Sequence, residues 1–279
     1  MTQTTSKTRP YIIVLGNEKG GTGKSTVSMH VIVHLMRLGF KVSSIDLDAR
    51  QGTLTRYIEN RTTFCTSSNT KLPTPTHIGL LKSTNLNVTE AEAEDKKAFE
   101  NCLNDFSSSD FIVIDTPGTD SYLSRLAHSY ADTLITPLND SFIDMDMLAR
   151  VNPENGAIIR PSTYSEMVWD QKKQKAIRGE KSFDWIVMRN RLSSIYAKNK
   201  EEMKLALEAL AKRVGFRIAS GFGERVIFRE LFLKGLTVLD LADAGIDMSL
   251  SHVAARQELR ELLKGIDLPQ IQQSLEKAA

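Results

Sequence analysis

A glycine-rich segment with two lysines, Lys19-Gly-Gly-Thr-Gly-Lys24-Ser25-Thr26, has the residue types that bind nucleotide phosphates. Successive glycines let a backbone curl so that its N–H groups point at phosphate oxygens, and a helix that follows adds the positive end of its dipole. In such a loop Lys24 would reach the terminal phosphates and the Ser25 hydroxyl would bind Mg²⁺. The general pattern G-x-x-x-x-G-K-S/T requires glycine at position 18, where this chain has Glu18. The sequence therefore predicts a phosphate loop of an altered type, with Lys19 beside its first glycine.

Carboxylates follow two apolar runs at the places where strands would end. Asp46-Leu47-Asp48 follows Ile45, and Asp115 follows Phe111-Ile-Val-Ile114. Ligands of open α/β sheets bind outside the carboxyl ends of the strands. A carboxylate at position 115 can hold Mg²⁺ through water, and the peptide N–H groups of Thr116–Gly118 could sense a γ-phosphate as a switch loop. The alternative is that these groups only cap exposed strand ends.

Three further features carry weaker signals. Asn190 follows the apolar run Trp185–Met188, and its amide can both donate and accept hydrogen bonds, as a purine edge requires, although asparagine is also common in turns. His30 and His34 are four residues apart but lack the glutamate of a zinc-binding H-E-x-x-H, so we expect packing or surface roles. The run Lys172-Lys173-Gln174-Lys175 is expected to lie on the solvated surface.

The elements that must position these residues begin with a βαβ unit. Tyr11–Leu15 is a short apolar run typical of a buried strand, and the glycine-rich turn follows it. Lys24–Leu38 has apolar residues at helical spacing and ends at Gly39. The second strand is expected over Lys41–Ile45. A strand, a helix and a second strand within so short a stretch imply a parallel sheet.

The rest of the chain continues this alternation. Expected strands are Phe111–Ile114, Thr133–Thr136, Trp185–Met188 and, as a weaker candidate, Arg217–Ile218. Expected helices are Thr89–Phe106, 142–151 and 196–214, while Thr62–Pro75 is expected to be loop. The pattern predicts one doubly wound α/β domain over residues 1–279, with a core at 10–245, a polar insertion at 152–183 and a C-terminal helical tail at 246–279.

Composition excludes several classes of protein. The 279 residues carry 36 Lys+Arg and 34 Asp+Glu, so a net charge of +2 indicates neither a nucleic-acid nor a membrane partner for the chain as a whole. Two cysteines cannot form a disulfide framework, and the polar residues 1–10 do not form a signal peptide. No apolar run approaches the ~20 residues that span a bilayer. We therefore expect a cytoplasmic protein without membrane attachment.

Local charge is less even. Residues 186–234 contain 11 Lys+Arg against 5 Asp+Glu, which leaves a negative balance on the remainder. A solvated helix face with internal charge pairs would explain this region, and so would a DNA-binding surface. The candidate DNA-binding residues are Lys200, Lys204, Lys212, Arg213, Arg225 and Arg229.

The phosphate-loop segment resembles the deviant Walker A ATPases, a family that includes ParA, MinD, arsenite-pump ATPases and the nitrogenase iron protein. Their motif K-G-G-x-G-K-S/T matches Lys19 to Ser25. The resemblance implies a homodimer that encloses ATP and Mg²⁺, with Lys19 reaching the partner's nucleotide, Asp48 positioning the attacking water and Asp46 supporting the metal site. It also implies that Asn190 binds the adenine edge. The nucleotide-binding residues would then be Lys19, Gly20, Gly21, Thr22, Gly23, Lys24, Ser25, Thr26 and Asn190, with catalysis by Lys19, Lys24 and Asp48 and metal binding by Ser25, Asp46 and Asp115.

Within that group the chain is most similar to the MipZ family, whose members position the bacterial division plane. The matching segments are Gly16-Asn-Glu-Lys-Gly-Gly, Ile45-Asp-Leu-Asp with Arg50-Gln51, Asp115-Thr-Pro-Gly-x-Asp120, Pro137–Asp144 and Pro161–Trp169. This resemblance implies an ATP-bound dimer that binds DNA non-specifically, interacts with ParB and inhibits FtsZ assembly. It also implies a cytoplasmic protein that associates with the nucleoid and is graded from the cell poles. An iron–sulfur role is disfavoured because no cysteine follows Asp115, and the C-terminal segment lacks the large apolar residues of a membrane-binding helix.

Two other functions stay open on these residues. One is a ParA-type chromosome or plasmid partition ATPase, against which Pro161–Trp169 argues. The other is a metabolic P-loop ligase similar to dethiobiotin synthetase, against which Lys19 argues. A ligand-free glycine turn and a nicotinamide-binding loop are disfavoured, because the segment follows a buried strand, opens a helix and carries Lys24-Ser25.

Overall fold

A parallel sheet of seven strands forms the centre of the molecule, with the order β3-β2-β4-β1-β5-β8-β9. The computed structural model describes residues 9–139, 141–152, 158–190, 197–269 and 271. The strands of the sheet are β1 (Tyr11–Leu15), β2 (Val42–Asp46), β3 (Thr76–Gly79), β4 (Phe111–Asp115), β5 (Thr133–Asn139), β8 (Asp184–Asn190) and β9 (Arg217–Ala219). The order reverses at β1, so the crevice outside the carboxyl end of β1 is the expected ligand site of a doubly wound fold.

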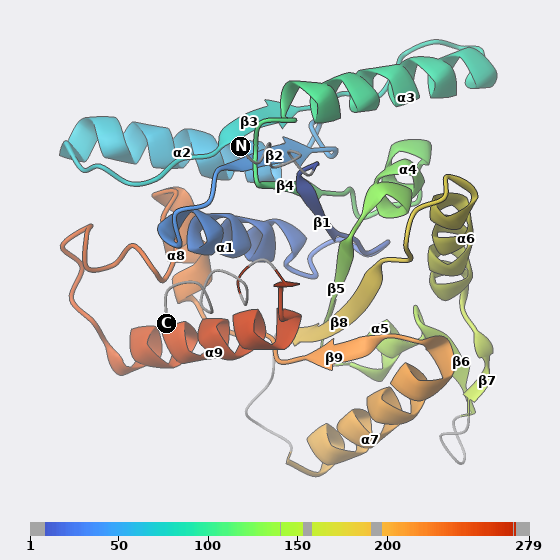
Figure 1. Ribbon diagram of the computed structural model, residues 1–279. Coiled ribbons are helices and arrows are strands. Elements are labelled where there is room, and N and C mark those ends of the chain that lie inside the picture. Colours follow the sequence, from blue (N-terminus) through green and yellow to red (C-terminus); the bar gives the residue numbers. More distant parts are fainter. Residues whose placement is uncertain (1–8, 140, 153–157, 191–196, 270, 272–279) are drawn as a thin grey trace, which may run out of the picture.

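Helices cover both faces of the sheet (Figure 1). The described helices are α1 (Lys24–Arg37), α2 (Thr53–Ser68), α3 (Val88–Asp105), α4 (Tyr122–Tyr130), α5 (Phe142–Met145), α6 (Thr163–Ile177), α7 (Ala197–Val214), α8 (Ile227–Leu233) and α9 (Leu250–Ile266). Side chains of a strand alternate between faces, so Ile13 and Leu15 of β1 pack with α1, α2, α8 and α9, whereas Ile12 and Val14 pack with α3, α4, α6 and α7. The predicted doubly wound architecture is confirmed.

Two helices differ clearly in extent from the sequence-based expectations. The stretch from Thr62 to Pro75 is not all loop, because α2 continues to Ser68. The hydroxyls of Thr62, Thr66 and Ser68 bond back to backbone carbonyls one turn earlier, and Phe64 packs against the core. These local bonds let a helix run through residues whose composition is typical of a loop.

The expected helix at 142–151 was also wrong in extent. The helix α5 ends at Met145, and β6 (Ala149–Val151) pairs antiparallel with β7 (Ile158–Pro161) as a separate two-stranded sheet. Within the 152–183 segment, α6 is the crossover helix between β5 and β8 and packs against α4. Within the 246–279 segment, α9 has buried side chains that pack in the core, and the helix contacts β9.

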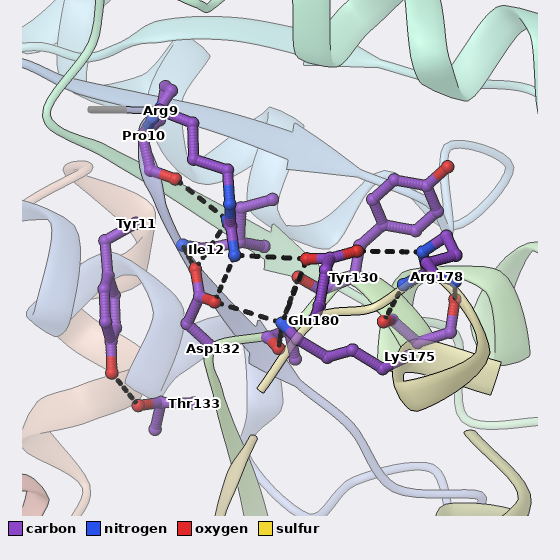
Figure 2. A network of polar contacts seen from close by, with 12 residues as sticks. Arg9, Pro10, Tyr11, Ile12, Tyr130, Asp132, Thr133, Lys175, Arg178 and Glu180 are labelled. Carbon is purple, nitrogen blue, oxygen red and sulfur yellow. Dashed lines mark hydrogen bonds and ion pairs between the residues drawn. The ribbon is translucent and has the colours of Figure 1, made fainter. Parts of the chain in front are cut away.

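A polar network lies at the amino ends of β1 and β5 (Figure 2). Lys175 of α6 is only 1% exposed, and its ammonium lies 3.0 Å from Asp132 Oδ1. Arg9 binds the same carboxylate, and Glu180 lies 3.7 Å from the Lys175 ammonium. The expected surface position of the lysine run is therefore wrong for Lys175, because a carboxylate on the sheet edge stabilises the buried charge.

Candidate nucleotide site

The glycine-rich loop lies between the carboxyl end of β1 and the first turn of α1. Gly21 and Gly23 have φ angles of 72° and 92°, which favour glycine. A side chain on Gly23 would also collide with Asn190, whose Nδ2 lies 2.3 Å from the Cβ position. The Thr22 hydroxyl oxygen is buried and has no hydrogen-bond partner among the described residues. This unused hydroxyl and the amino end of a 14-residue helix fit a phosphate group.

Lys24 folds back onto its own loop. Its ammonium donates to the carbonyls of Asn17 and Lys19 at 3.1 and 2.9 Å, and the residue is 8% exposed. Burial lowers the pKa of this ammonium, and the charges of Asp115 and Asp48 oppose that effect. The lysine is thus held at the loop by neutral acceptors that a phosphate oxygen can replace.

Lys19 points in a different direction. Its ammonium lies 2.8 Å from Asp144 Oδ1 and donates to the Ile143 carbonyl at 2.9 Å. The Lys19 side chain remains 36% exposed, so it is on the surface at the edge of the loop. The two lysines of the motif therefore have separate positions, one within the loop and one facing outward.

Ser25 and Asp115 come together across the first turn of α1. The Ser25 hydroxyl donates to Asp115 Oδ2 at 2.5 Å, and the Ser28 hydroxyl donates to Oδ1 at 3.1 Å. Burial, and next the neighbouring Asp46 charge, raise the pKa of Asp115 to about 7. A hydroxyl beside a carboxylate, at the end of a strand next to the phosphate loop, is the ligand combination that Mg²⁺ takes with nucleotide phosphates.

Asp46 and Asp48 have different environments. Asp46 is fully buried, and its carboxylate accepts from the Asp48 backbone N–H at 2.9 Å and from the Thr55 N–H and hydroxyl at 3.0 Å each. These contacts show that Asp46 holds the turn that carries Asp48, and its expected support of the metal site stays a prediction. Asp48 is half-buried; burial, followed by the Asp46 charge, raises its pKa.

The segment after β4 contacts the phosphate loop directly. Thr116 donates from its hydroxyl and its N–H to the Leu15 carbonyl, at 2.8 and 3.2 Å. A Cβ on Gly118 would lie 2.8 Å from the Gly20 nitrogen, so only glycine allows this approach of the two backbones. A movement of the Thr116–Asp120 segment would therefore displace or release the phosphate loop that it contacts.

Asn190 lies against the loop and beside a pocket. It is 6% exposed, and its Nδ2 donates to the Thr22 carbonyl at 2.6 Å. The adjacent pocket has a volume of about 400 Å³. Its lining includes Gly23, Thr26, Asn190, Phe222, Arg225, Phe228 and Arg229. Aromatic rings and an amide beside a phosphate loop fit a nucleoside.

The predicted DNA-binding residues do not form one group. Lys204, Lys212 and Arg213 lie on α7, and the side chain of Lys200 lies outside the described residues. Arg225 and Arg229 instead line the pocket beside the phosphate loop, and Arg225 pairs with Glu258 at 2.6 Å. DNA binding by all six residues stays a prediction.

Sequence reasoning missed several residues that shape the site. The Asn17 amide donates to the Pro137 carbonyl at 2.5 Å, and its oxygen accepts from the Lys19 N–H at 2.6 Å. No role was predicted for Asp144 or Thr55, because their contacts join residues far apart in the chain. The only sequence signal for Asn17 was its place inside the loop motif.

Solved structures with a similar fold belong to proteins of different functions. A McdA variant from Cyanothece in complex with ATP has a TM-score of 0.58 and 14% identity, covering 92% of this chain and 97% of the other. MinD from Aquifex aeolicus has a TM-score of 0.52 and 17% identity, with coverage of 91% and 97%. Cobyrinic acid a,c-diamide synthase from Mycobacterium smegmatis, with an ATP analogue and magnesium, has a TM-score of 0.56 and 17% identity, with coverage of 92% and 96%. At these identities the likeness establishes the fold alone.

The sheet order, the loop with its two lysines and these neighbours define a P-loop ATPase fold of the ParA/MinD type. The sequence model of the family described as "ATPase MipZ" matches residues 11–270. The chain therefore belongs to the MipZ ATPase family, as the resemblance predicted. No curated protein sequence gives a significant match. Within the described residues, no helix is long and apolar enough to cross a membrane.

Proposed function

We propose that the chain is a MgATP-dependent switch that dimerises around two nucleotides, hydrolyses ATP slowly and positions the cell division plane. The observation that carries this proposal is the separation of the two motif lysines. Lys24 lies at the carbonyls of its own loop, whereas Lys19 faces outward from it. A single chain needs only the first of these to bind phosphate, so the second is available to a nucleotide in another subunit.

The chain's own residues divide the chemistry between them. Bound MgATP supplies the phosphoanhydride bond and the cation that neutralises its charge. Lys24 would exchange its loop carbonyls for phosphate oxygens, while Ser25 and Asp115 would hold the metal. Asp48 would orient the attacking water, and Asp46 keeps the Asp48 turn in place through the Asp48 N–H.

The base and the sugar of the nucleotide would occupy the neighbouring pocket. Asn190 borders it, and Phe222 and Phe228 present their rings 4.8 Å apart between centroids. The Asn190 amide would read the purine edge, and the two rings would contact its face. Arg229 also lines the pocket and would contact the sugar or a phosphate.

Partners are proposed from family membership and surface charge. We expect the ATP-bound dimer to bind DNA non-specifically through Lys200, Lys204, Lys212 and Arg213, to interact with ParB and to inhibit FtsZ assembly. The protein would then be cytoplasmic and nucleoid-associated, and graded from the cell poles. A ParA-type partition role shares the same site and differs only in these partners.

Imaging a fluorescent fusion in the source cell tests the positioning role. A gradient from the poles that disappears in Lys24→Ala, together with misplaced septa, supports the proposal. Foci that follow a plasmid would instead identify a partition ATPase, and a membrane coat would contradict the proposed localisation.

The metabolic ligase has one structural argument in its favour, because a synthetase of cobyrinic acid a,c-diamide has the same fold. The two functions differ in their assembly. A ligase should keep one oligomeric state with and without ATP, whereas the proposed switch should become a dimer only when ATP is bound. Size-exclusion chromatography with and without MgATP distinguishes them.

A further inference from the structure

A buried chain of hydrogen-bond donors ends on the carbonyl of Gly16, the residue that joins β1 to the phosphate loop. The indole N–H of Trp185 donates to Thr136 Oγ1 at 3.0 Å, and Thr136 Oγ1 lies 3.0 Å from the Tyr164 hydroxyl. Tyr164 donates to the Gly16 carbonyl at 2.8 Å. Because an indole can only donate and the Tyr164 proton is used on Gly16, the Thr136 hydroxyl must donate to Tyr164. Each hydrogen bond in this series therefore donates in the direction from β8 to the phosphate loop.

His128 of α4 closes the other side of this site. Its Nδ1 lies 2.6 Å from the Ser124 carbonyl and must carry the proton, so Nε2 is an acceptor. Nε2 lies 3.2 Å from the Tyr164 hydroxyl, farther than the Gly16 carbonyl at 2.8 Å that takes the Tyr164 proton. Burial lowers the pKa of His128 to about 4, so the ring is neutral near pH 7. A Cβ on Gly16 would lie 2.3 Å from His128 Nε2. The Gly16 peptide is thus enclosed between α4 and α6.

The peptide that Tyr164 holds leads directly to both motif lysines. The Gly16 carbonyl shares a peptide plane with the Asn17 nitrogen. The Asn17 carbonyl accepts from the Lys24 ammonium at 3.1 Å, and its side-chain oxygen accepts from the Lys19 N–H. Tyr164 also lies within the Pro161–Trp169 segment that the sequence singled out and that the nucleotide site itself does not use.

We propose that Tyr164 is a positioning residue for the phosphate loop, acting through the Gly16–Asn17 peptide. It touches no nucleotide. Its hydroxyl fixes the orientation of the first peptide of the loop, and thereby the acceptors that place Lys24 and Lys19 before a nucleotide arrives. The expected effect of Tyr164 on ATP binding and hydrolysis rests on the proposed function. Its effect on the conformation of the phosphate loop does not depend on any ligand.

The chain offers a matched control in Tyr57. Its hydroxyl donates to the Leu236 carbonyl at 2.7 Å, and both tyrosines are almost completely buried. Tyr57 lies on α2 and its bond ends outside the phosphate loop. Tyr164→Phe and Tyr57→Phe therefore each remove a buried hydroxyl-to-carbonyl bond while keeping the ring, and Tyr164→Phe also removes the acceptor of the Thr136 hydroxyl. A merely structural role predicts lower stability for both variants, without a change in exchange specific to residues 16–24.

The experiment compares these two variants with the wild type in three measurements. Tyr164→Phe should speed amide hydrogen exchange over residues 16–24 without nucleotide, weaken MgATP binding by about fivefold, the worth of one ordinary hydrogen bond, and lower kcat. Tyr57→Phe should also lose thermal stability, yet match the wild type in all three measurements. Equal exchange over 16–24 in both variants would overturn the inference. A wild type that does not bind ATP would overturn the proposed function instead, and the exchange comparison would still decide the role of Tyr164.

Discussion

The ammonium of Lys19 lies 2.8 Å from Asp144 Oδ1 within the same chain. Asp144 is only 14% exposed, so the pair occupies a partly desolvated position at the edge of the phosphate loop. If Lys19 serves the nucleotide of a second subunit, it must first leave Asp144. On the proposed function, the ion pair would hold the free chain in a form that opposes dimerisation, and two such pairs would break for each dimer formed.

Asp144→Asn should therefore strengthen the ATP-bound dimer. A partly exposed pair contributes up to about 1 kcal/mol, so we expect the dimer dissociation constant to fall by roughly two- to tenfold. Sedimentation across a concentration series measures it. Asp146→Asn is the control, because that exposed carboxylate lies two residues further on and does not pair with Lys19. A weaker dimer for Asp144→Asn would show that Asp144 supports the interface.

Lys24→Ala should abolish nucleotide binding. The loop would lose its only buried cation against the terminal phosphates, and charge-assisted bonds to phosphate are among the strongest that a loop makes. Equilibrium titration with ATP and Mg²⁺ measures the loss. Normal affinity in this variant would contradict the assignment of the glycine-rich segment as a phosphate loop.

The phosphate loop and most strands could be predicted because their signals are local. The apolar run before Gly16, the glycines and the lysines all lie within a short stretch, and short apolar runs mark strands wherever they are buried on both faces. The contacts of Asp144, Thr55 and Tyr164 could not be predicted, because each depends on how distant strands are ordered in the sheet. The end of α2 was missed because hydroxyl-to-backbone bonds offset a composition that favours loop.

A buried ion pair between Arg61 and Asp240 should control stability at acid pH. Both side chains are fully buried and lie 2.8 Å apart. Burial of Asp240 opposes its ionisation, but the hydrogen bonds and charge of Arg61 outweigh burial and hold its pKa well below 3.8. The unfolded chain then takes up the proton first, so the free energy of unfolding should fall as pH drops below about 4. Denaturant titrations between pH 7 and 3 check this decline, which Asp240→Asn should flatten.

Removing Arg61 should be costly at neutral pH. Arg61→Met leaves the Asp240 charge buried without its main partner, which typically costs about 3–5 kcal/mol. Arg37 also contacts Asp240, at 2.7 Å, but is 30% exposed, so Arg37→Met should cost less than about 1 kcal/mol. Equal losses for the two variants would mean that burial does not set the strength of the pair.

Charge reversal on α7 should weaken DNA binding without changing ATP hydrolysis measured in the absence of DNA. The variant carries Lys204→Glu, Lys212→Glu and Arg213→Glu. Each lost phosphate contact should reduce the slope of log affinity against log salt by about 0.9. The control reverses the exposed lysines Lys82, Lys96 and Lys97, which gives the same net charge far from α7. If both triple variants lose affinity equally, net charge and not the α7 surface determines binding.

The molar mass of Asp48→Ala in MgATP is the most direct test of the proposed switch. In the proposed site the phosphate contacts come from the loop, Lys24 and the metal, so this variant should still bind ATP and engage Lys19 across the interface. It lacks the carboxylate that orients water, and its phosphate release should fall at least tenfold, equal to about 1.4 kcal/mol of barrier. Light scattering should therefore show a stable dimer with ATP, a monomer with ADP, and a monomer under both conditions when Lys19→Ala is added. A monomeric Asp48→Ala in ATP, or a dimer that survives Lys19→Ala, would contradict the account.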